Sequence, residues 1–381
     1  MFGLTSEQRS FRETALRFAQ NVLAPASRQI EAEGRVPMSL RRQMGELGLI
    51  GVEMPAEYGG LAVDHVTSGV VIESIAEGDF NVAYIQLLAS LCGTIVARHA
   101  SPELAAEILP GVCSGEKIIA LALTEPQGGS DAASLRLKAT RDGDSYILNG
   151  EKTSISMADQ SEYAVVFART GTEAERAYGV SAFLVDLDAS GISRTRFDDL
   201  GEHAIGRGSI FFDNVRVPAS RLLGGEGKGF VQVMQGFDFS RALIGLQCLS
   251  VARVCLAETW KYVSERKAFG KPLSDNQGVT FPLAECETHV EAARLLCYRT
   301  LAAKDAGVPH TREAAMCKWW APQLAFEVVH KCLLMHGHAG YSTELPFEQR
   351  LRDVLGLQIG DGTAQIMKLI IARETLKSLA T

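Results

Sequence analysis

An apolar run that ends abruptly in a Pro/Gly turn does most to limit how this chain can fold. Residues 118–123 are continuously apolar and predict a buried strand. The Thr-Glu-Pro-Gln-Gly-Gly-Ser-Asp run at 124–131 predicts a turn that leaves the hydroxyls of Thr124 and Ser130 and two glycine N–H groups free. Such groups at the end of a strand suit the carbonyl edge of a ring or a phosphate. An ordinary surface turn would also fit these few residues.

The hydrophobic pattern changes twice along the chain and divides it into three predicted domains. Residues 1–117 have apolar positions at helical spacing, with a typical helix start at Thr5. Residues 118–224 carry strand-like runs and an Asp-Gly hairpin signal. Residues 225–381 return to long helical runs whose apolar faces need partners. We therefore predict an α+β, mainly α protein: an N-terminal helical domain, a middle antiparallel β domain and a C-terminal four-helix bundle.

The composition predicts a globular, cytoplasmic protein. The chain has 381 residues, of which 46% are hydrophobic and 22% charged, and a net charge of -7. This balance gives no basic field for nucleic acid or an anionic membrane, and no stretch is typical of a signal peptide or a membrane span. The 8 cysteines form no C-x-x-C pair, which predicts free thiols in a reducing compartment. His336 and His338 lack a Cys or acidic neighbour at ligand spacing, so no metal site is expected.

Further motifs extend along the whole chain, and together they resemble the acyl-CoA dehydrogenase family. The turn at 124–131 is similar to that family's T-E-P-x-x-G-S-D signature. Other matching segments are 48–60, 146–152, 210–218, 265–270 and 357–366. The resemblance implies a three-domain, FAD-dependent homotetramer. It also implies an acyl-CoA substrate and an electron-transfer flavoprotein that receives the electrons.

The resemblance assigns a set of residues to FAD. Leu123 and Thr124 would face the flavin ring, and Ser156 would donate towards flavin N5. Arg266 and Phe269 would reach the FAD of a neighbouring subunit, because an Arg fork suits a pyrophosphate. The full implied set is Leu123, Thr124, Ser130, Ser156, Arg266, Phe269, Gln277, Thr363 and Gln365.

Three departures from the family's pattern concern the flavin. Ser154 replaces a Trp that normally packs near the ring, so this face should be more open. In the glycine-rich FAD motif, Leu334 stands in place of a Gln and His338 in place of a Gly. We therefore expect the adenosine end of FAD to be held differently here.

Residues 237–241, Phe-Asp-Phe-Ser-Arg, resemble the F-D-x-x-R motif that meets the adenosine end of coenzyme A. Phe237 can stack on adenine, and Asp238 can accept a hydrogen bond from its amine. Arg241 completes the motif. A plain amphipathic helix start is the alternative. By the same resemblance, Ser130 and Gly362 also contact the substrate.

Asp361 is the expected catalytic base, in a segment similar to the family's I-Y-E-G-T-x-x-I motif. The α-proton of a thioester is too weakly acidic to leave without a carboxylate beside it. Asp361 stands where most members have Glu. Some members place the base where this chain has Ser240, which cannot serve. A helix-capping Asp is the alternative, since a helical run follows.

The residues around Asp361 predict the shape of the substrate. Asp is shorter than Glu by one bond, roughly 1.5 Å, and Gly360 stands where many members have Tyr. The added space favours a cyclic or branched acyl-CoA, such as cyclohexanecarboxyl-CoA. Apolar Ala83, Leu87 and Leu91 would suit a hydrocarbon ring, and no carboxylate lies nearby in that segment to act as a second base.

Three other functions stay open at this stage. A nitroalkane-oxidase-like flavoenzyme also uses an Asp base, but it needs no adenosine site such as Phe237, Asp238 and Arg241. A dehydrogenase that acts on an acyl group bound to a carrier protein would use the same chemistry, with the carrier protein in place of coenzyme A. A flavin-free helical interaction scaffold would lack the yellow colour of a flavoprotein.

Overall fold

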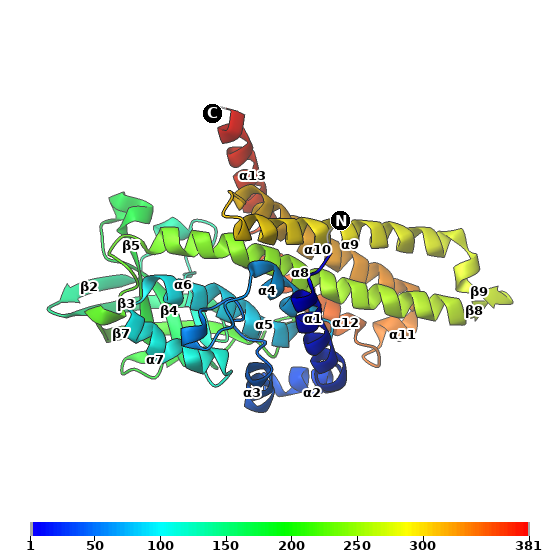
Figure 1. Ribbon diagram of the computed structural model, residues 1–381, viewed down its shortest axis with the longest axis horizontal. Coiled ribbons are helices and arrows are strands. Elements are labelled where there is room, and N and C mark those ends of the chain that lie inside the picture. Colours follow the sequence, from blue (N-terminus) through cyan, green and yellow to red (C-terminus); the bar gives the residue numbers. More distant parts are fainter. Residues whose placement is uncertain (1–2, 380–381) are drawn as a thin grey trace.

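The computed structural model describes residues 3–379, in which helical regions precede and follow a central sheet (Figure 1). The N-terminal helices are α1 (Ser6–Phe18), α2 (Ala24–Glu33), α3 (Met38–Glu46), α4 (His65–Ala76), α5 (Phe80–Leu88), α6 (Thr94–His99) and α7 (Pro102–Cys113). Two π-helical turns, Ala19–Leu23 and Ala89–Gly93, join α1 to α2 and α5 to α6. Thr5 accepts from the N–H of Gln8 at 3.1 Å, so the helix start expected there is confirmed.

The middle region is one sheet with the strand order β1-β4-β2-β3-β7-β6 and β5 paired with β4. Its strands are β1 (Ile119–Ala122), β2 (Lys138–Asp142), β3 (Ser145–Ser156), β4 (Tyr163–Arg169), β5 (Val180–Asp186), β6 (Ile192–Arg194) and β7 (Arg207–Pro218). Both β1 and β2 run parallel to β4, so the sheet is mixed and not antiparallel throughout as predicted. Alternation of apolar and polar residues along a strand predicts the face on which each side chain lies. It does not predict whether the paired strand runs parallel or antiparallel.

The C-terminal region is built on one long helix, α8 (Gly229–Glu265). The other elements are β8 (Lys267–Ala268), β9 (Lys271–Pro272), α9 (Gln277–Asp305), α10 (Thr311–Met335), α11 (His338–Tyr341), α12 (Phe347–Gly356) and α13 (Ala364–Leu379). Figure 1 shows α8 and α9 extending to the β8–β9 hairpin at the end opposite the sheet, and α13 projecting from the body. The long helices expected from sequence are present, and α13 packs on α10 while its C-terminal part projects from the body (Figure 1).

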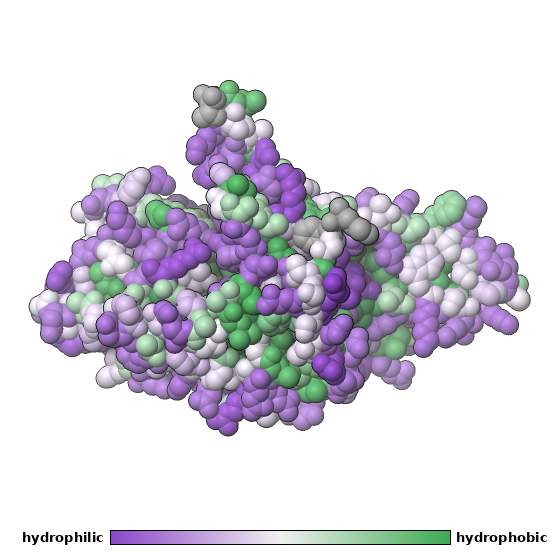
Figure 2. Space-filling view, in the orientation of Figure 1, coloured by the Kyte–Doolittle hydropathy of each residue, from purple (hydrophilic) through white to green (hydrophobic). Residues whose placement is uncertain are grey.

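Two helical segments are long and apolar enough to cross a membrane by length and composition, which the sequence reading did not anticipate. They are Phe80–His99 and Gly229–Glu265, and 89% and 78% of their apolar windows are buried inside the protein. This burial is typical of core helices. Figure 2 shows a largely hydrophilic face with scattered apolar patches. All 8 cysteines are buried and free, in agreement with the absence of disulfides expected from their spacing.

Candidate active site

A cavity of about 720 Å³ lies where the sheet, α5, α8 and the loop between α12 and α13 meet. Segments far apart in the sequence therefore converge on one space. The assigned residues that line it are Leu123, Thr124, Ser130, Ser156, Phe237, Arg241, Asp361, Gly362 and Thr363.

A buried ion pair holds the turn that follows β1. Lys152 on β3 is fully buried and donates to Glu125 Oε1 at 2.7 Å and to the carbonyl oxygen of Leu123 at 2.9 Å. Glu125 also accepts from the N–H groups of Arg136 and Leu137 at 2.6 and 2.9 Å. Burial lowers the pKa of Lys152 to about 8. Burial acts to raise the pKa of Glu125, but Lys152 and the backbone donors outweigh it and lower that pKa.

Free hydroxyl groups surround the cavity beside this turn. Within residues 3–379, the hydroxyls of Thr124, Ser130 and Ser156 hydrogen-bond to no other protein group. Ser154 is exposed at a bulge in β3 with φ 56°, which agrees with the open face expected where the family has Trp. Small hydroxyl donors around an open space fit the ring edge and phosphate oxygens of FAD.

Asp361 lies in the loop before α13, with its backbone in the left-handed region at φ 54° and Gly362 next to it at φ 106°. Its Oδ2 accepts from Ser240 Oγ on α8 at 3.0 Å. Burial raises the pKa of Asp361 above its ordinary value, against the charges of Lys318 and Arg241 and the Ser240 hydrogen bond. A carboxylate with a raised pKa is a stronger base towards a carbon acid.

Lys318 on α10 closes the loop that carries Asp361. Its Nζ donates to the carbonyl oxygens of Leu357 at 2.7 Å and Gly362 at 3.1 Å, one at each end of the loop. The side chain is buried, and burial lowers its pKa to about 8. Sequence reasoning missed Lys318, although a single Lys among apolar residues at 314–321 was the available signal.

The proposed coenzyme A motif forms a connected group. Arg241 donates to Asp238 at 3.2 Å, and its guanidinium lies 5.4 Å from the centre of the Phe237 ring. Asp238 also accepts from Thr311 at 2.6 Å, and it does not itself line the cavity. Arg241 Nε donates to the carbonyl oxygen of Asp361 at 3.4 Å. The motif is therefore coupled to the loop of the expected base.

Four of the assigned FAD residues do not line this cavity. Arg266, Phe269 and Gln277 lie around the β8–β9 end of α8 and α9, far from the sheet (Figure 1). Phe269 is wholly exposed. Gln365 is exposed on α13, whereas its neighbour Thr363 lines the cavity. One chain alone therefore does not bring the complete assigned set together.

Thr363, and not Asp361, accepts a hydrogen bond from the first turn of α13. Its Oγ1 accepts from the N–H of Ile366 at 3.5 Å. The Asp361 carboxylate is turned to Ser240 on another helix. The helix-capping alternative for Asp361 therefore does not fit the structure.

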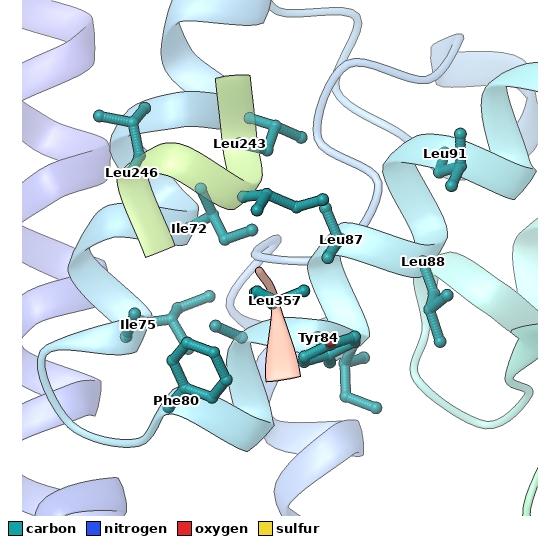
Figure 3. Close-up of a cluster of buried hydrophobic side chains, with 14 of the residues drawn as sticks. Ile72, Ile75, Phe80, Tyr84, Leu87, Leu88, Leu91, Leu243, Leu246 and Leu357 are labelled. Atoms are coloured by element: carbon teal, nitrogen blue, oxygen red, sulfur yellow. The ribbon is translucent and has the colours of Figure 1, made fainter. Parts of the chain in front are cut away.

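The helical segment from α5 onwards supplies an apolar wall. Leu87, Leu88 and Leu91 line the cavity, whereas Ala83 is buried without lining it, so that part of the prediction is wrong. Figure 3 shows Tyr84 beside Leu357, with Leu88 and Leu91 further along the segment.

Sequence reasoning also missed polar groups in this wall. Tyr84, Arg207 and Asp199 line the cavity, and Glu202 lies directly behind them. Asp199 is thus a second carboxylate at the cavity, contributed by a segment other than the one inspected in the sequence. Their positions in the sequence gave no periodic or motif signal.

Three family models match almost the whole chain. They describe the acyl-CoA dehydrogenase N-terminal domain at residues 5–116, middle domain at 120–215 and C-terminal domain at 227–376. The chain belongs to the acyl-CoA dehydrogenase family. The family's three-domain fold is confirmed, and its members are FAD-dependent oxidoreductases that act on a CH–CH group.

Similar acyl-CoA dehydrogenases carry names for differently shaped acyl groups. The chain is 35% identical to the mitochondrial isobutyryl-CoA dehydrogenase of Dictyostelium discoideum, covering 98% of this chain and 90% of that protein. It is 34% identical to the cyclohexane-1-carbonyl-CoA dehydrogenase of Geobacter metallireducens, covering 100% of both. The structure of butyryl-CoA dehydrogenase from Megasphaera elsdenii matches with TM-score 0.95 and 31% identity, covering 99% and 100% of the two chains.

Proposed function

We propose that this acyl-CoA dehydrogenase acts on a cyclic or α-branched acyl-CoA and that Asp361 is its base. The observation that carries the proposal is the place of Asp361. Asp361 lines the same cavity as Thr124 and Ser156, whose hydroxyls are free. A base and flavin-type contacts in one space of about 720 Å³ leave room for a thioester between them.

The residues divide the chemistry as follows. Asp361 accepts the α-proton, and its backbone N–H holds the thioester oxygen, which makes the α-carbon more acidic. Lys318 keeps the loop closed around this geometry. The chemistry that FAD would supply here is an acceptor for the β-hydrogen and its electron pair. The backbone of Leu123 and the hydroxyls of Thr124, Ser130, Ser156 and Thr363, all residues that line the cavity, would hold the cofactor.

The shape of the space supports a bulky acyl group. A Cβ added at Gly360 would meet no atom within 4 Å, so the space directly beside this residue is open. Ser154 leaves a second opening beside the assigned flavin contacts. A straight chain would lie loosely there, with its α-proton too far from Asp361 for efficient transfer. A ring or branch would press the α-carbon towards the carboxylate.

The group formed by Phe237, Asp238 and Arg241 disfavours a nitroalkane substrate. Arg241 donates to Asp238 and to the backbone of Asp361 and lies over the Phe237 ring, and a nitroalkane has no adenosine for this group to hold. A carrier-protein thioester remains the second candidate, because it presents the same acyl chemistry on a different handle.

The assigned FAD residues outside the cavity support a proposed homotetramer with shared FAD sites. Arg266, Phe269 and Gln277 can contact FAD only if the β8–β9 end of one subunit reaches the cavity of another. The exposed Phe269 and the projecting α13, with Leu369 and Leu376 exposed, suit such contacts. We assign an electron-transfer flavoprotein as electron acceptor and the cytoplasm as the site of action.

The decisive experiment is anaerobic titration of the yellow holoenzyme with straight, branched and cyclic acyl-CoAs. Steady-state assays with an artificial electron acceptor then give kcat/KM for each. We expect bleaching of the flavin and a higher kcat/KM for the cyclic or α-branched thioesters. A clear preference for butyryl- or octanoyl-CoA would contradict the proposed cyclic or α-branched substrate. Flavin reduction by carrier-bound acyl groups alone would favour the carrier-protein thioester.

A further inference from the structure

A cluster of ionic and phenolic groups interrupts the otherwise apolar acyl wall. Tyr84 donates from its hydroxyl to Glu202 Oε2 at 3.2 Å. Arg207 Nη2 donates to Glu202 and, at 3.3 Å, to the hydroxyl oxygen of Tyr84. Asp199 lies 3.7 Å from Arg207 Nη1. Tyr84, Arg207 and Asp199 face the cavity, whereas Glu202 is 1% exposed.

The surrounding backbone is arranged to hold the carboxylate of this cluster. Glu202 itself adopts φ 57°, in the left-handed region that a residue with a side chain rarely occupies. Its N–H donates to Asp353 at 2.6 Å, and Asp353 also accepts from Asn81 at 3.1 Å. A Cβ at Gly356 would stand 2.3 Å from Glu202 Oε1, so only glycine fits there. Three separate segments are therefore shaped around one ionic group.

A cavity wall that binds only hydrocarbon does not need a cluster of ionic and phenolic groups. Burying an ion pair is unfavourable compared with packing apolar side chains of the same volume. The neighbouring positions Leu87, Leu88 and Leu91 show that the same helical segment supplies apolar groups where they suffice. The polar cluster therefore points to a ligand group that apolar side chains would not recognise.

The cluster lies within reach of the reacting carbons. Arg207 pairs with Ser156 across β3 and β7, and Ser156 is an assigned flavin contact. The charge of Arg207 acts on Asp361, and that of Asp361 acts on Tyr84. Because Tyr84, Arg207 and Asp361 line the same cavity, an acyl group with its α-carbon at Asp361 can extend its outer atoms towards Tyr84 and Arg207.

We propose that Tyr84 and Arg207 select an acyl group that carries an uncharged oxygen, a hydroxyl or a keto group. The proposal rests on the function proposed above and narrows its substrate class. Within residues 3–379, Arg207 Nε makes no hydrogen bond, and Nη1 has only the ion pair with Asp199 at 3.7 Å, so Nε can donate to a substrate oxygen. Tyr84 keeps a lone pair that can accept from a substrate hydroxyl.

The charge balance within the cluster disfavours a carboxylate-bearing acyl group beside Tyr84 and Arg207. Arg207 supplies one positive charge, and Glu202 and Asp199 supply two negative ones. A further carboxylate would meet net repulsion in a poorly solvated wall. A dicarboxylic thioester such as glutaryl-CoA is therefore expected to be a poor substrate.

The test compares acyl-CoAs that differ by one oxygen. Cyclohexanecarboxyl-CoA is assayed beside its 3-hydroxy, 4-hydroxy and 4-oxo derivatives and beside glutaryl-CoA. We expect at least one oxygenated ring to have a kcat/KM roughly tenfold or more above the hydrocarbon, because a site built for a hydroxyl leaves its polar groups unpaired with the analogue. Equal rates, or a preference for glutaryl-CoA, would overturn the proposal.

Variants then connect the preference to the cluster. Tyr84→Phe should reduce the preference for oxygen by roughly tenfold while the hydrocarbon ring is still oxidised. Tyr178→Phe makes the same change at an exposed Tyr outside the cavity and should leave the ratio unchanged. If Tyr84→Phe alters the flavin absorbance and not the ratio, the cluster serves the flavin and the proposal is wrong.

The outcomes separate this proposal from the one on which it rests. Oxidation of all rings at equal rates would show that Tyr84 and Arg207 do not select for an oxygen. The proposal of a cyclic substrate would be unaffected. If only straight-chain thioesters reduce the flavin, the cyclic class fails. The comparison of 4-hydroxybutyryl-CoA with butyryl-CoA then decides the oxygen preference by the same tenfold criterion.

Discussion

Two buried lysines hold the two loops that meet at the cavity, and they are compensated in different ways. Lys152, beneath the turn on the flavin side, pairs with Glu125 at 2.7 Å. Lys318, beneath the loop of Asp361, donates to the carbonyl oxygens of Leu357 and Gly362 and, within residues 3–379, forms no ion pair at hydrogen-bond distance. Burial lowers the pKa of both lysines to about 8.

The difference separates a structural cation from one whose charge acts on Asp361, the proposed base. Glu125 neutralises the charge of Lys152 by direct contact, and the pair holds the turn after β1 in place. The charge of Lys318 has no such partner, and it is the largest effect that opposes the burial-driven rise in the pKa of Asp361. The same type of group thus stabilises one loop and, in the other, also favours the ionised form of the base.

The largest expected effect is that of Asp361→Asn, which keeps the shape of the loop and removes the base. Flavin reduction by acyl-CoA under anaerobic stopped-flow should slow by about 10²- to 10⁴-fold. FAD and acyl-CoA should still bind, because Asn can accept the hydrogen bond from Ser240. Asp198→Asn is the matched control at an exposed position outside the cavity. A near-normal rate in the Asp361 variant would remove this residue from the mechanism.

Lys152→Met should act on stability instead of the chemical step. The change leaves Glu125 buried without a counter-charge, which costs about 3–5 kcal/mol when one partner of a buried pair is removed. The melting temperature and the FAD content should both fall. The double variant Lys152→Met/Glu125→Gln should recover part of the loss. An unchanged melting temperature with full FAD would show that the pair does not hold the turn.

Lys318→Met should slow flavin reduction by roughly 10- to 100-fold, because the loop of Asp361 loses its closure. The cation favours ionised Asp361, so its removal raises the pKa of Asp361 further, and the rate should begin to fall at a higher pH on acidification. Lys318→Arg keeps the charge and should restore the wild-type pH profile in part. A slower Met variant with an unchanged pH profile would limit Lys318 to a structural role.

The smallest expected effect is a change in substrate preference on refilling the space beside Asp361. Gly360 has a φ that other residues adopt, and a side chain there would meet no atom within 4 Å of its Cβ. Gly360→Tyr should therefore fold normally and shift the kcat/KM ratio from cyclic towards straight-chain acyl-CoA by about three- to tenfold. An unchanged ratio would show that the substrate does not use this space.

Much of the fold could be predicted because its signals are local. The helix start at Thr5 and the turn between β2 and β3 each depend on a few adjacent residues. The parallel pairing of β1 with β4 could not be predicted in this way. It joins segments whose relative direction depends on the chain between them.

The site shows the same division. Motif positions such as Thr124 and Asp361 were placed at the cavity by local patterns. Lys318 was missed because both of its acceptors are backbone carbonyl oxygens. Every residue has such an oxygen, so the acceptors leave no pattern in the sequence. Tyr84 and Arg207 were missed because each acquires its role only through contact with a different domain. Sequence thus predicted Asp361 at the cavity, and it did not predict the groups that surround it.

The central claim, that Asp361 removes an α-proton in the step that reduces the flavin, is tested most directly by isotopic substitution. The acyl-CoA that reduces the flavin fastest is prepared with hydrogen or deuterium at the α-carbon and mixed anaerobically with the wild-type holoenzyme. We predict slower single-turnover reduction with deuterium, and rates that fall on acidification through a pKa above the ordinary Asp value. Equal rates for the two isotopologues, with no acid limb of that kind, would contradict the account.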